Sequence, residues 1–292
     1  MQNELLKTSN RIYGGEIFFD FRVIPFSDLT GNLIDDVKHR KVDGFVATGV
    51  FSKEEVSRIL SWVEKADRNY FTQGSTGWLF PAPFAIITDT DEKLNDYFNK
   101  LNYFHGYLAE SGMTWFTERL HRFFEKCGSN FQIKIPLNKV ANKNVAPGNI
   151  RIFEPLKGGI PVHCGNYFQW RHTHFWSLLE EGIDMNDQLS FFVLLQNARE
   201  GGELTIYDML WDNVKKKVDV ENDDSVINDA GERIFLTDVK RFTVKPQPGD
   251  ILIFAGGPIW HRVENIRGEV PRITFGGFIN FSKDATKCYY WS

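Results

Sequence analysis

The residues best suited to chemistry in this chain are two histidines, His163 and His261, and a glycine two positions after the first of them. A face of two histidines and one carboxylate holds Fe(II) and leaves positions open for a co-substrate and oxygen. Here the residue at the place of the carboxylate is Gly165, which has no ligand atom. A metal bound by the two imidazoles would therefore have one more open position, and a halide can occupy it.

A co-substrate at such a centre needs an anchor of its own, and Arg272 with Thr274 is the candidate. A guanidinium binds a carboxylate through two parallel hydrogen bonds, a geometry that lysine cannot supply. The Thr274 hydroxyl can add another bond, and charge-assisted hydrogen bonds contribute about 1.5–3 kcal/mol each. This pair therefore predicts a carboxylate-binding site.

The elements that must position these residues are short strands. From about residue 149 onward the chain consists of β-rich runs separated by turn residues such as Gly201-Gly202 and Pro248-Gly249. Many short strands with such turns predict a β-rich α+β protein with a double-stranded β-helix, the jelly-roll barrel that cupins share. The expected strands are 150–153, 159–163, 189–195, 203–207, 241–244, 251–254 and 272–281.

Helices are expected to flank this core on its N-terminal side. Ser52 and Glu55 form a capping box, and apolar residues follow at helical spacing, which predicts a helix from 52 to about 67. A second helical region is expected from about 92 to 124, with a break near Gly112. Its apolar positions recur every three or four residues, which is typical of a core face.

The length of 292 residues fits one large domain or two small ones, and we expect a single domain over 1–292. Its N-terminal half, 1–148, would supply helical support and substrate-side elements, and 149–281 would form the jelly-roll catalytic core. The segment 209–240 is polar and acidic. It is expected to be a surface loop or a lid over the site.

Composition argues against several classes of partner. The formal net charge of −4 gives no general attraction for nucleic acid or for an anionic membrane. No apolar run reaches the roughly 18 residues of a membrane span, and the first ten residues do not read as a secretory signal. The three cysteines are too few and too scattered for a disulfide framework. We therefore expect a soluble, cytoplasmic protein that binds neither nucleic acid nor membrane.

The order of these pieces resembles that of the Fe(II)/2-oxoglutarate-dependent oxygenases, whose pattern reads His-x-Asp, Gly-Gly-x-Leu, Pro-x-Pro-Gly-Asp, a distal histidine and Arg-x-Ser/Thr. The matching residues are His163, Gly201-Gly202-Glu203-Leu204, Pro246-Gln247-Pro248-Gly249-Asp250, His261, Arg272 and Thr274. The resemblance covers about 149–281. It implies that His163 and His261 bind Fe(II), and that O2 is a co-substrate. It also implies that Arg272 and Thr274 hold 2-oxoglutarate.

Gly165 narrows the resemblance to the aliphatic halogenases of this superfamily, in which chloride takes the place of the carboxylate. The segment 159–168 and the wide gap before His261 look like the freestanding halogenases of hapalindole-type indole alkaloid biosynthesis, in the welwitindolinone and ambiguine pathways. That group chlorinates an unactivated sp3 carbon of a complete small molecule. The resemblance therefore implies a chloride site at Gly165, a hydrophobic substrate of the indole alkaloid class, and no carrier protein.

The same resemblance implies a substrate pocket. Ile160 and Phe168 would line it, and Phe80 would form a rigid aromatic wall, unless its stretch is packed core. In that group a serine near the iron directs the outcome toward chlorination. Ser190 is the nearest candidate here.

Three other interpretations stay open. A 2-oxoglutarate-dependent hydroxylase would use water at the position of Gly165. A cupin-type dioxygenase would use His172, His174 and Glu180 with His261, but its first motif is slightly too long here and leaves Arg272 without a role. A non-catalytic jelly-roll binding module would keep the pocket without turnover.

Overall fold

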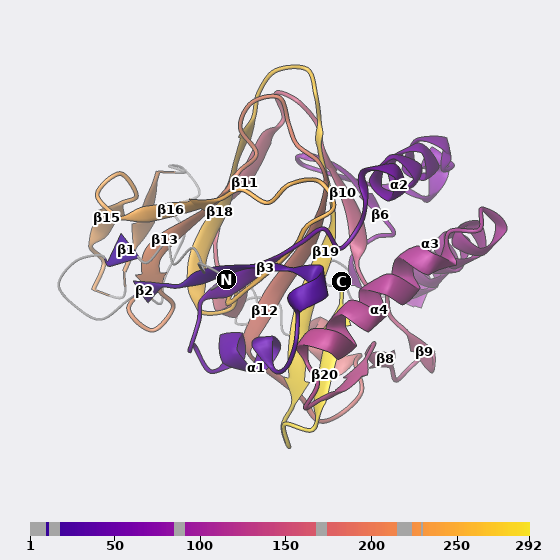
Figure 1. Ribbon diagram of the computed structural model, residues 1–292, viewed down its shortest axis with the longest axis horizontal. Helices are drawn as coiled ribbons and strands as arrows, with labels where there is room; N and C mark the ends of the chain where they lie inside the picture. The colour runs from indigo at the N-terminus through magenta and orange to yellow at the C-terminus, as the bar shows by residue number, and fades with distance from the viewer. Residues whose placement is uncertain (1–9, 12–17, 85–90, 168–173, 215–223, 229) are drawn as a thin grey trace.

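The computed structural model describes residues 10–11, 18–84, 91–167, 174–214, 224–228 and 230–292. Two β-sheets and a set of helices make up most of these residues (Figure 1). The helices α2, α3 and α4 gather on one side of the molecule, and β13, β15 and β16 lie on the other. The protein is therefore a sheet-rich α+β structure, as the sequence predicts.

The larger sheet has ten strands and draws on the whole length of the chain. All its pairs are antiparallel except β3 with β4 and β20 with β7. The order is β3 (Phe21–Pro25), β4 (Gly44–Thr48), β17 (Ile251–Phe254), β12 (Ile183–Gln196), β19 (Arg272–Ser282), β10 (Asn149–Phe153), β6 (Gly77–Phe80) and β5 (Thr72–Gly74), with β20 (Lys287–Trp291) beside β19 and β7 (Gln132–Lys134) beside β20.

The smaller sheet has four antiparallel strands in the order β11 (Gly158–His163), β18 (Ile259–Ile266), β13 (Leu204–Leu210) and β16 (Arg241–Val244). The other strands of the described residues pair two by two. They are β1 (Asn10–Arg11) with β2 (Phe18–Phe19), β8 (Leu137–Asn138) with β9 (Lys143–Asn144), and β14 (Ser225–Ile227) with β15 (Arg233–Phe235).

The longer helices are α2 (Lys53–Lys65), α3 (Asp91–Glu110) and α4 (Thr114–Cys127), and the shorter ones are α1 (Leu33–Lys38) and α6 (His174–Ser177), with 3-10 turns η1 (Phe26–Asp28) and η2 (Arg68–Tyr70). The predicted capping box is present, because the Glu55 amide donates to the Ser52 hydroxyl and the Ser52 amide donates to the Glu55 carboxylate. The predicted break near Gly112 is also confirmed, and it separates α3 from α4.

Strand alternation gives the larger sheet two different faces. Phe191 and Phe275 point to the helices, where their rings lie 5.1 and 4.9 Å from rings of α4. The side chains next to them in each strand therefore point to the opposite face. Strand register brings together on that face Arg151, Phe153, Ser190, Phe192, Leu194, Phe254, Arg272 and Thr274.

The smaller sheet covers this second face. The ring of Phe254 lies 4.9 Å from that of His261, and the ring of Phe21 lies 5.3 Å from that of Phe242 in β16. The amide of Gly165 donates to the carbonyl of Gly256 over 2.8 Å. The space between the two sheets is therefore where the candidate functional residues meet.

All seven predicted strands are present, but three features differ from the expectation. His261 lies inside strand β18, which was not among the expected strands. The N-terminal half, 1–148, supplies the strands β3 to β6 of the larger sheet in addition to helices, and β20 extends that sheet beyond residue 281. Within 209–240, β14 and β15 form a pair, whereas 215–223 and 229 lie outside the described residues, so the expectation of a lid stays a prediction.

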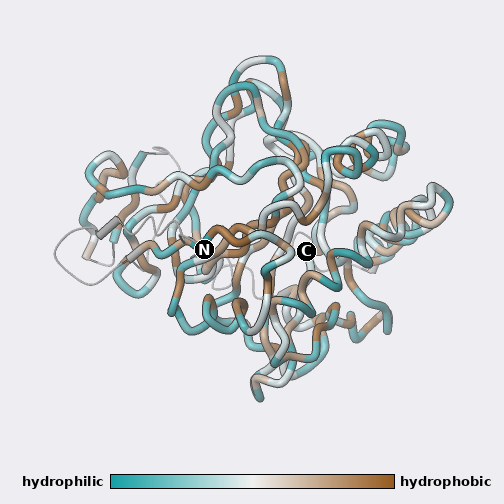
Figure 2. Tube along the Cα trace, viewed as in Figure 1, coloured by the Kyte–Doolittle hydropathy of each residue, from teal (hydrophilic) through white to brown (hydrophobic). Residues whose placement is uncertain are grey.

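Hydrophobic residues concentrate along the central strands, and hydrophilic residues predominate toward the outer loops (Figure 2). One continuous core joins residues of the larger sheet with residues of α2, α3 and α4. Cys127, Cys164 and Cys288 are free thiols, and all three are buried. Among the described residues, none of the helices is both long and apolar enough to span a membrane.

Candidate active site

The two predicted metal ligands face each other across the pair β11–β18. His163 and His261 are register partners, and partners in an antiparallel pair project their side chains to the same side. Their ring centroids are 4.3 Å apart at an interplanar angle of 56°. Register shifts on both sides of Ile160 adjust β11 so that the two imidazoles meet. Two rings at this separation can bind one metal ion.

Backbone carbonyls fix the tautomer of both rings. Nδ1 of His163 donates to the carbonyl of Pro161 over 2.7 Å, and Nδ1 of His261 donates to that of Ile259 over 2.8 Å. A carbonyl only accepts, so the proton is on Nδ1 and the lone pair of each ring is on Nε2. Desolvation lowers the pKa of His163 to about 4 and that of His261 well below its ordinary value. Both rings are therefore neutral nitrogen ligands of the kind that Fe(II) accepts.

Gly165 lies two residues after the end of β11 and is buried. A Cβ added to it would come within 2.5 Å of Nε2 of Gln188, and within 2.9 and 3.0 Å of two carbons of the same side chain. Gln188 is only 3% exposed. The place where an aspartate at residue 165 would stand is therefore bordered by a carboxamide, which the sequence did not lead us to expect.

Arg272 is held between two aromatic rings on the inner face of the larger sheet. Its guanidinium carbon lies 5.4 Å from the ring centre of Phe153 and 5.0 Å from that of Phe192. The side chain is 5% exposed, and desolvation, with a smaller effect of the charge of Arg151, lowers its pKa to about 10. Thr274, also buried, lies two residues further along the same face. The predicted anchor therefore exists as an inward-facing pair.

Two motifs of the predicted pattern have structural roles beside this anchor. Gly202 has a φ of +74°, and a Cβ added to it would lie 2.9 Å from Cδ of Arg272, so only glycine fits there. Asp250 accepts hydrogen bonds from the amides of Gly49 and Gln247 over 3.0 and 2.7 Å. That carboxylate closes the turn before β17 and joins it to the end of β4.

Arg151 is a second cation at this site, and none of the sequence motifs includes it. It lies opposite Thr274 in the pair β10–β19, and desolvation lowers its pKa to about 10. Its charge also lowers the pKa of both His163 and Arg272, so it lies within electrostatic reach of the imidazole pair and of the anchor. An arginine between two isoleucines in a buried strand is the signal that could have revealed it.

The hydrogen bonds of this region are incomplete. Nε of Arg151 donates to Oδ1 of Asn149 over 3.1 Å, while the buried Nδ2 of Asn149 has no hydrogen-bond partner. Among the residues that the structure describes, neither Arg151 nor Arg272 forms an ion pair with a carboxylate. Two cations and an unsatisfied donor suit a ligand with two carboxylates, so these residues fit 2-oxoglutarate.

The predicted substrate residues have different surroundings. Ile160 is the register partner of Val263, two residues from His261 on the same face of β18, and is partly exposed. Phe168 lies outside the described residues. Phe80 is fully buried on the helix side, with its ring 5.8 Å from that of Trp62. The structure therefore puts Phe80 in the packed core, the alternative that its sequence left open.

The role expected for Ser190 beside the iron stays a prediction. It projects from β12 to the inner face, where it meets Gly256. The side chain that meets Gly165 is Gln188, two residues earlier in the same strand. The hydroxyl group of Ser190 made it the natural candidate, whereas nothing in the sequence pattern singles out a glutamine.

The ligand set of a cupin is not assembled among the described residues. Glu180 accepts from the amide of Leu137 over 2.9 Å and from the hydroxyl of Tyr289 over 3.3 Å, so its carboxylate is engaged elsewhere. His172 and the side chain of His174 lie outside the described residues. Within the ranges that the structure describes, no group of three or more His, Cys, Asp or Glu side chains could hold a metal.

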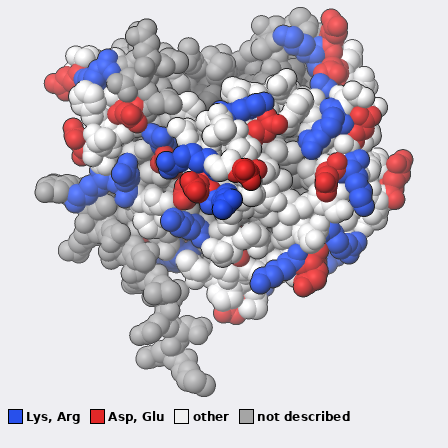
Figure 3. All heavy atoms as spheres, turned by 90° about the horizontal axis from the view of Figure 1, so that it is seen from above, with Lys and Arg blue, Asp and Glu red and all other residues white. Residues whose placement is uncertain are grey.

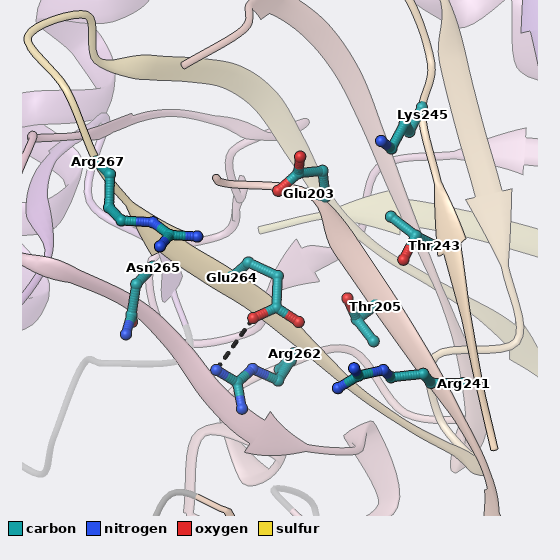
Figure 4. A pocket seen from close by; sticks show the side chains of 9 residues that line it. All are labelled: Glu203, Thr205, Arg241, Thr243, Lys245, Arg262, Glu264, Asn265 and Arg267. Carbon is teal, nitrogen blue, oxygen red and sulfur yellow. Dashed lines mark ion pairs between the residues drawn. The ribbon is translucent and has the colours of Figure 1, made fainter. Parts of the chain in front are cut away.

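A separate hollow of about 480 Å³ lies on the outer face of the smaller sheet (Figure 4). Arg262 and Glu264 alternate with the inward residues of β18, and their ion pair spans 3.0 Å. The lining carries both charge signs, and its residues are Glu203, Thr205, Arg241, Thr243, Lys245, Arg262, Glu264, Asn265 and Arg267. Positive and negative side chains are also interspersed over the face of the molecule in Figure 3. Because its lining residues alternate with the inward residues of β18, the hollow lies on the opposite face of the smaller sheet from the imidazole pair.

Comparisons with known proteins identify the family of this chain and solved structures that resemble it. The family described as carrier-protein-independent halogenase WelO5 matches residues 18–292. A solved N-substituted L-amino acid dioxygenase from Burkholderia ambifaria AMMD is 17% identical, with a TM-score of 0.50, and the match covers 88% of this chain and 90% of that chain. A structure of such a dioxygenase in complex with alpha-KG, from the same organism, is 16% identical, with a TM-score of 0.49, and the match covers 88% of this chain and 89% of that chain. No match was found among curated protein sequences.

Proposed function

The chain belongs to the family of carrier-protein-independent halogenases, and from this premise we propose that it chlorinates an unactivated sp3 carbon of a free hydrophobic small molecule. It is a non-haem iron, 2-oxoglutarate-dependent oxidoreductase. An indole alkaloid is the substrate class that we propose. The observation that carries the proposal is Gly165, which offers no ligand atom beside two paired, neutral imidazoles.

The proposed metal ligands are Nε2 of His163 and Nε2 of His261. Iron bound there would supply the activation of O2 and the transfer of chlorine to the substrate. The protein holds both rings in the ligand tautomer through the carbonyls of Pro161 and Ile259. The position facing Gly165 is left for chloride.

The proposed role of Arg272, Thr274 and Arg151 is to bind and orient 2-oxoglutarate. Arg272 can hold the carboxylate far from the metal, since Phe153 and Phe192 fix the faces of its guanidinium and leave its edges for hydrogen bonds. The proposed role of Arg151, whose charge lowers the pKa of His163, is to neutralise the carboxylate near the metal. A co-substrate held at both ends would have one orientation at the imidazole pair.

Apolar residues between the sheets are proposed to exclude water from the reaction. Phe254 contacts His261 edge-on, and Ile160 with Val263 continues this wall along β11 and β18. We keep Phe168 as a proposed pocket residue on the strength of the sequence resemblance. We also propose that the two facing sheets form the jelly-roll of a single domain, since strands from both 1–148 and 149–281 build the larger sheet.

The proposal is tested by anaerobic reconstitution with Fe(II) and 2-oxoglutarate while chloride is titrated, with the visible charge-transfer band as the signal. A band that forms and shifts with chloride is the expected result. A band whose position does not depend on chloride would favour a hydroxylase over a halogenase. The absence of any band would instead favour the non-catalytic binding module.

A further inference from the structure

The carboxamide of Gln188 fills the space beside Gly165. Its Nε2 is the nearest atom to a Cβ added at residue 165, at 2.5 Å, and the side chain is 3% exposed. A primary amide has two donor hydrogens, so Gln188 brings hydrogen-bond donors to the position where Gly165 offers no side-chain atom. Its location suggests a function at the very place where chloride is proposed to bind.

The backbone around Gln188 is shaped to hold it there. The pairing of β12 with β19 is irregular between Asp184 and Leu189, and Asp187 has a φ of +51°, a left-handed conformation that costs energy for a residue with a side chain. The amide group of Asn166 donates to the Asp187 carboxylate over 2.8 Å and its oxygen accepts from the Asp187 amide over 3.2 Å. These bonds join the segment that follows β11 to the irregular part of β12.

A third segment completes this arrangement. The amide of Gly257 donates to the carbonyl of Gln188 over 2.6 Å, and the carbonyl of Gly257 accepts from the amide of Asn166 over 3.0 Å. The backbone on both sides of the carboxamide is therefore fixed by hydrogen bonds. These bonds fix where the Gln188 side chain leaves the backbone, beside Gly165.

We propose that Gln188 is part of the halide site, where its Nε2–H donates a hydrogen bond to the halide that takes the carboxylate's position. This inference rests on the proposed function. A neutral amide donor stabilises an anion without binding the metal itself, and charge-assisted hydrogen bonds are about twice as strong as neutral ones. Gln188 would thus increase halide affinity and fix the halide's position relative to the substrate.

The test is a chloride titration of the anaerobic enzyme–Fe(II)–2-oxoglutarate complex, followed by the visible band rather than by turnover. Gln188→Met keeps the length of the side chain and removes the donor, so the chloride dissociation constant should rise by about tenfold or more, as expected for a hydrogen bond to a charged group. Gln188→Glu keeps the shape and adds a negative charge, so the chloride response should disappear. In Gln188→Met, iron content and the band without chloride should remain unchanged.

Gln132→Glu, an exposed glutamine on β7, is the matched control, and it should titrate like the unsubstituted protein. Chloride affinities of Gln188→Met and Gln188→Glu equal to that control would overturn the role of Gln188 and leave the proposed function intact. Weaker iron binding with tighter chloride binding in Gln188→Met would also overturn it, because the carboxamide would then be a metal ligand. If the unsubstituted enzyme forms its band but ignores chloride, the proposed function itself fails.

Discussion

At the scale of single residues, charge is the least balanced feature of the site. Burial lowers the pKa of both Arg151 and Arg272, and the charge of Arg151 lowers that of Arg272 further, with a smaller opposing effect of Glu203. In the described residues no carboxylate forms an ion pair with either arginine. Such an arrangement is costly in the ligand-free protein and favourable once a dianion binds. Activity and stability therefore make opposite demands on these positions.

The first prediction concerns Arg151→Met, which removes one cation and keeps an unbranched side chain. Because repulsion with Arg272 disappears, the thermal midpoint of the ligand-free protein should stay the same or rise. Because one carboxylate partner disappears, the rise of that midpoint on adding 2-oxoglutarate should shrink, and the 2-oxoglutarate dissociation constant should increase by roughly tenfold. Thermal scans with and without co-substrate measure both effects.

Arg241→Met is the matched control for this variant, because Arg241 is an exposed residue of the outer hollow. It should leave both quantities unchanged. If Arg151→Met responded to 2-oxoglutarate as strongly as the control, Arg151 would have no role in co-substrate binding.

The second prediction concerns Gly165→Asp. A Cβ at this position meets the Gln188 side chain at 2.5–3.0 Å, so the aspartate alone must displace that side chain and should bind iron more weakly than it does when the space is clear. Combined with Gln188→Ala, which clears the space, the same aspartate should restore iron binding and abolish the chloride response. Iron content and chloride titration of the single and double variants check this. A double variant that still responds to chloride would contradict the assignment of Gly165.

The sequence predicted the residues that follow a known order and missed those that depend on the third dimension. The order of motifs along the chain identified four candidate residues, His163, His261, Arg272 and Thr274. Gln188 reaches Gly165 only through the irregular pairing of β12, which no local pattern reveals. A similar limit applied to Phe80, since a buried aromatic stretch reads alike whether it faces helices or a substrate.

At the scale of elements, α2 combines a strong local signal with a tertiary contact. Ser52 and Glu55 form the capping box, and the same Glu55 carboxylate accepts from Arg119 of α4 over 2.7 Å. The cap therefore orders the start of α2 and also connects it to the neighbouring helix.

The third prediction is that Ser52→Ala lowers the free energy of unfolding by about 1 kcal/mol, the usual loss when an N-cap hydroxyl is removed. Urea unfolding followed by circular dichroism measures it. Ser57→Ala, an exposed serine in the interior of the same helix, is the control and should be neutral or slightly stabilising. Equal effects of the two substitutions would argue against the cap.

Strand β18 shows why some elements escape prediction. Its sequence alternates residues of the inner face, such as His261 and Val263, with Arg262 and Glu264 of the outer hollow. A histidine followed by two charged residues in the next three positions resembles a loop in a hydropathy profile. The strands found easily, such as β17, are buried on both faces and read as uninterrupted apolar runs.

At the scale of the whole molecule, all three cysteines are buried free thiols. Desolvation raises the pKa of the thiols of both Cys127 and Cys288, so at pH 8 the thiolate fraction is small as well as inaccessible. The fourth prediction is that an aromatic disulfide reagent labels less than one thiol per native chain within minutes and all three cysteines after unfolding in urea. Rapid labelling of the native protein would contradict the burial of these side chains.

The division of tasks among the strands has a consequence for how this site can change. The imidazoles and the carbonyls that orient them belong to β11 and β18, the arginines belong to β10 and β19, and the glutamine beside the open position belongs to β12. Metal binding, co-substrate binding and the residue beside the open position therefore belong to different strands. Selection could therefore exchange the residue at 188, and with it the anion or the fate of the substrate radical, while leaving metal binding and co-substrate capture untouched. A library confined to residues 187–190 would explore new outcomes without dismantling the machinery that drives them.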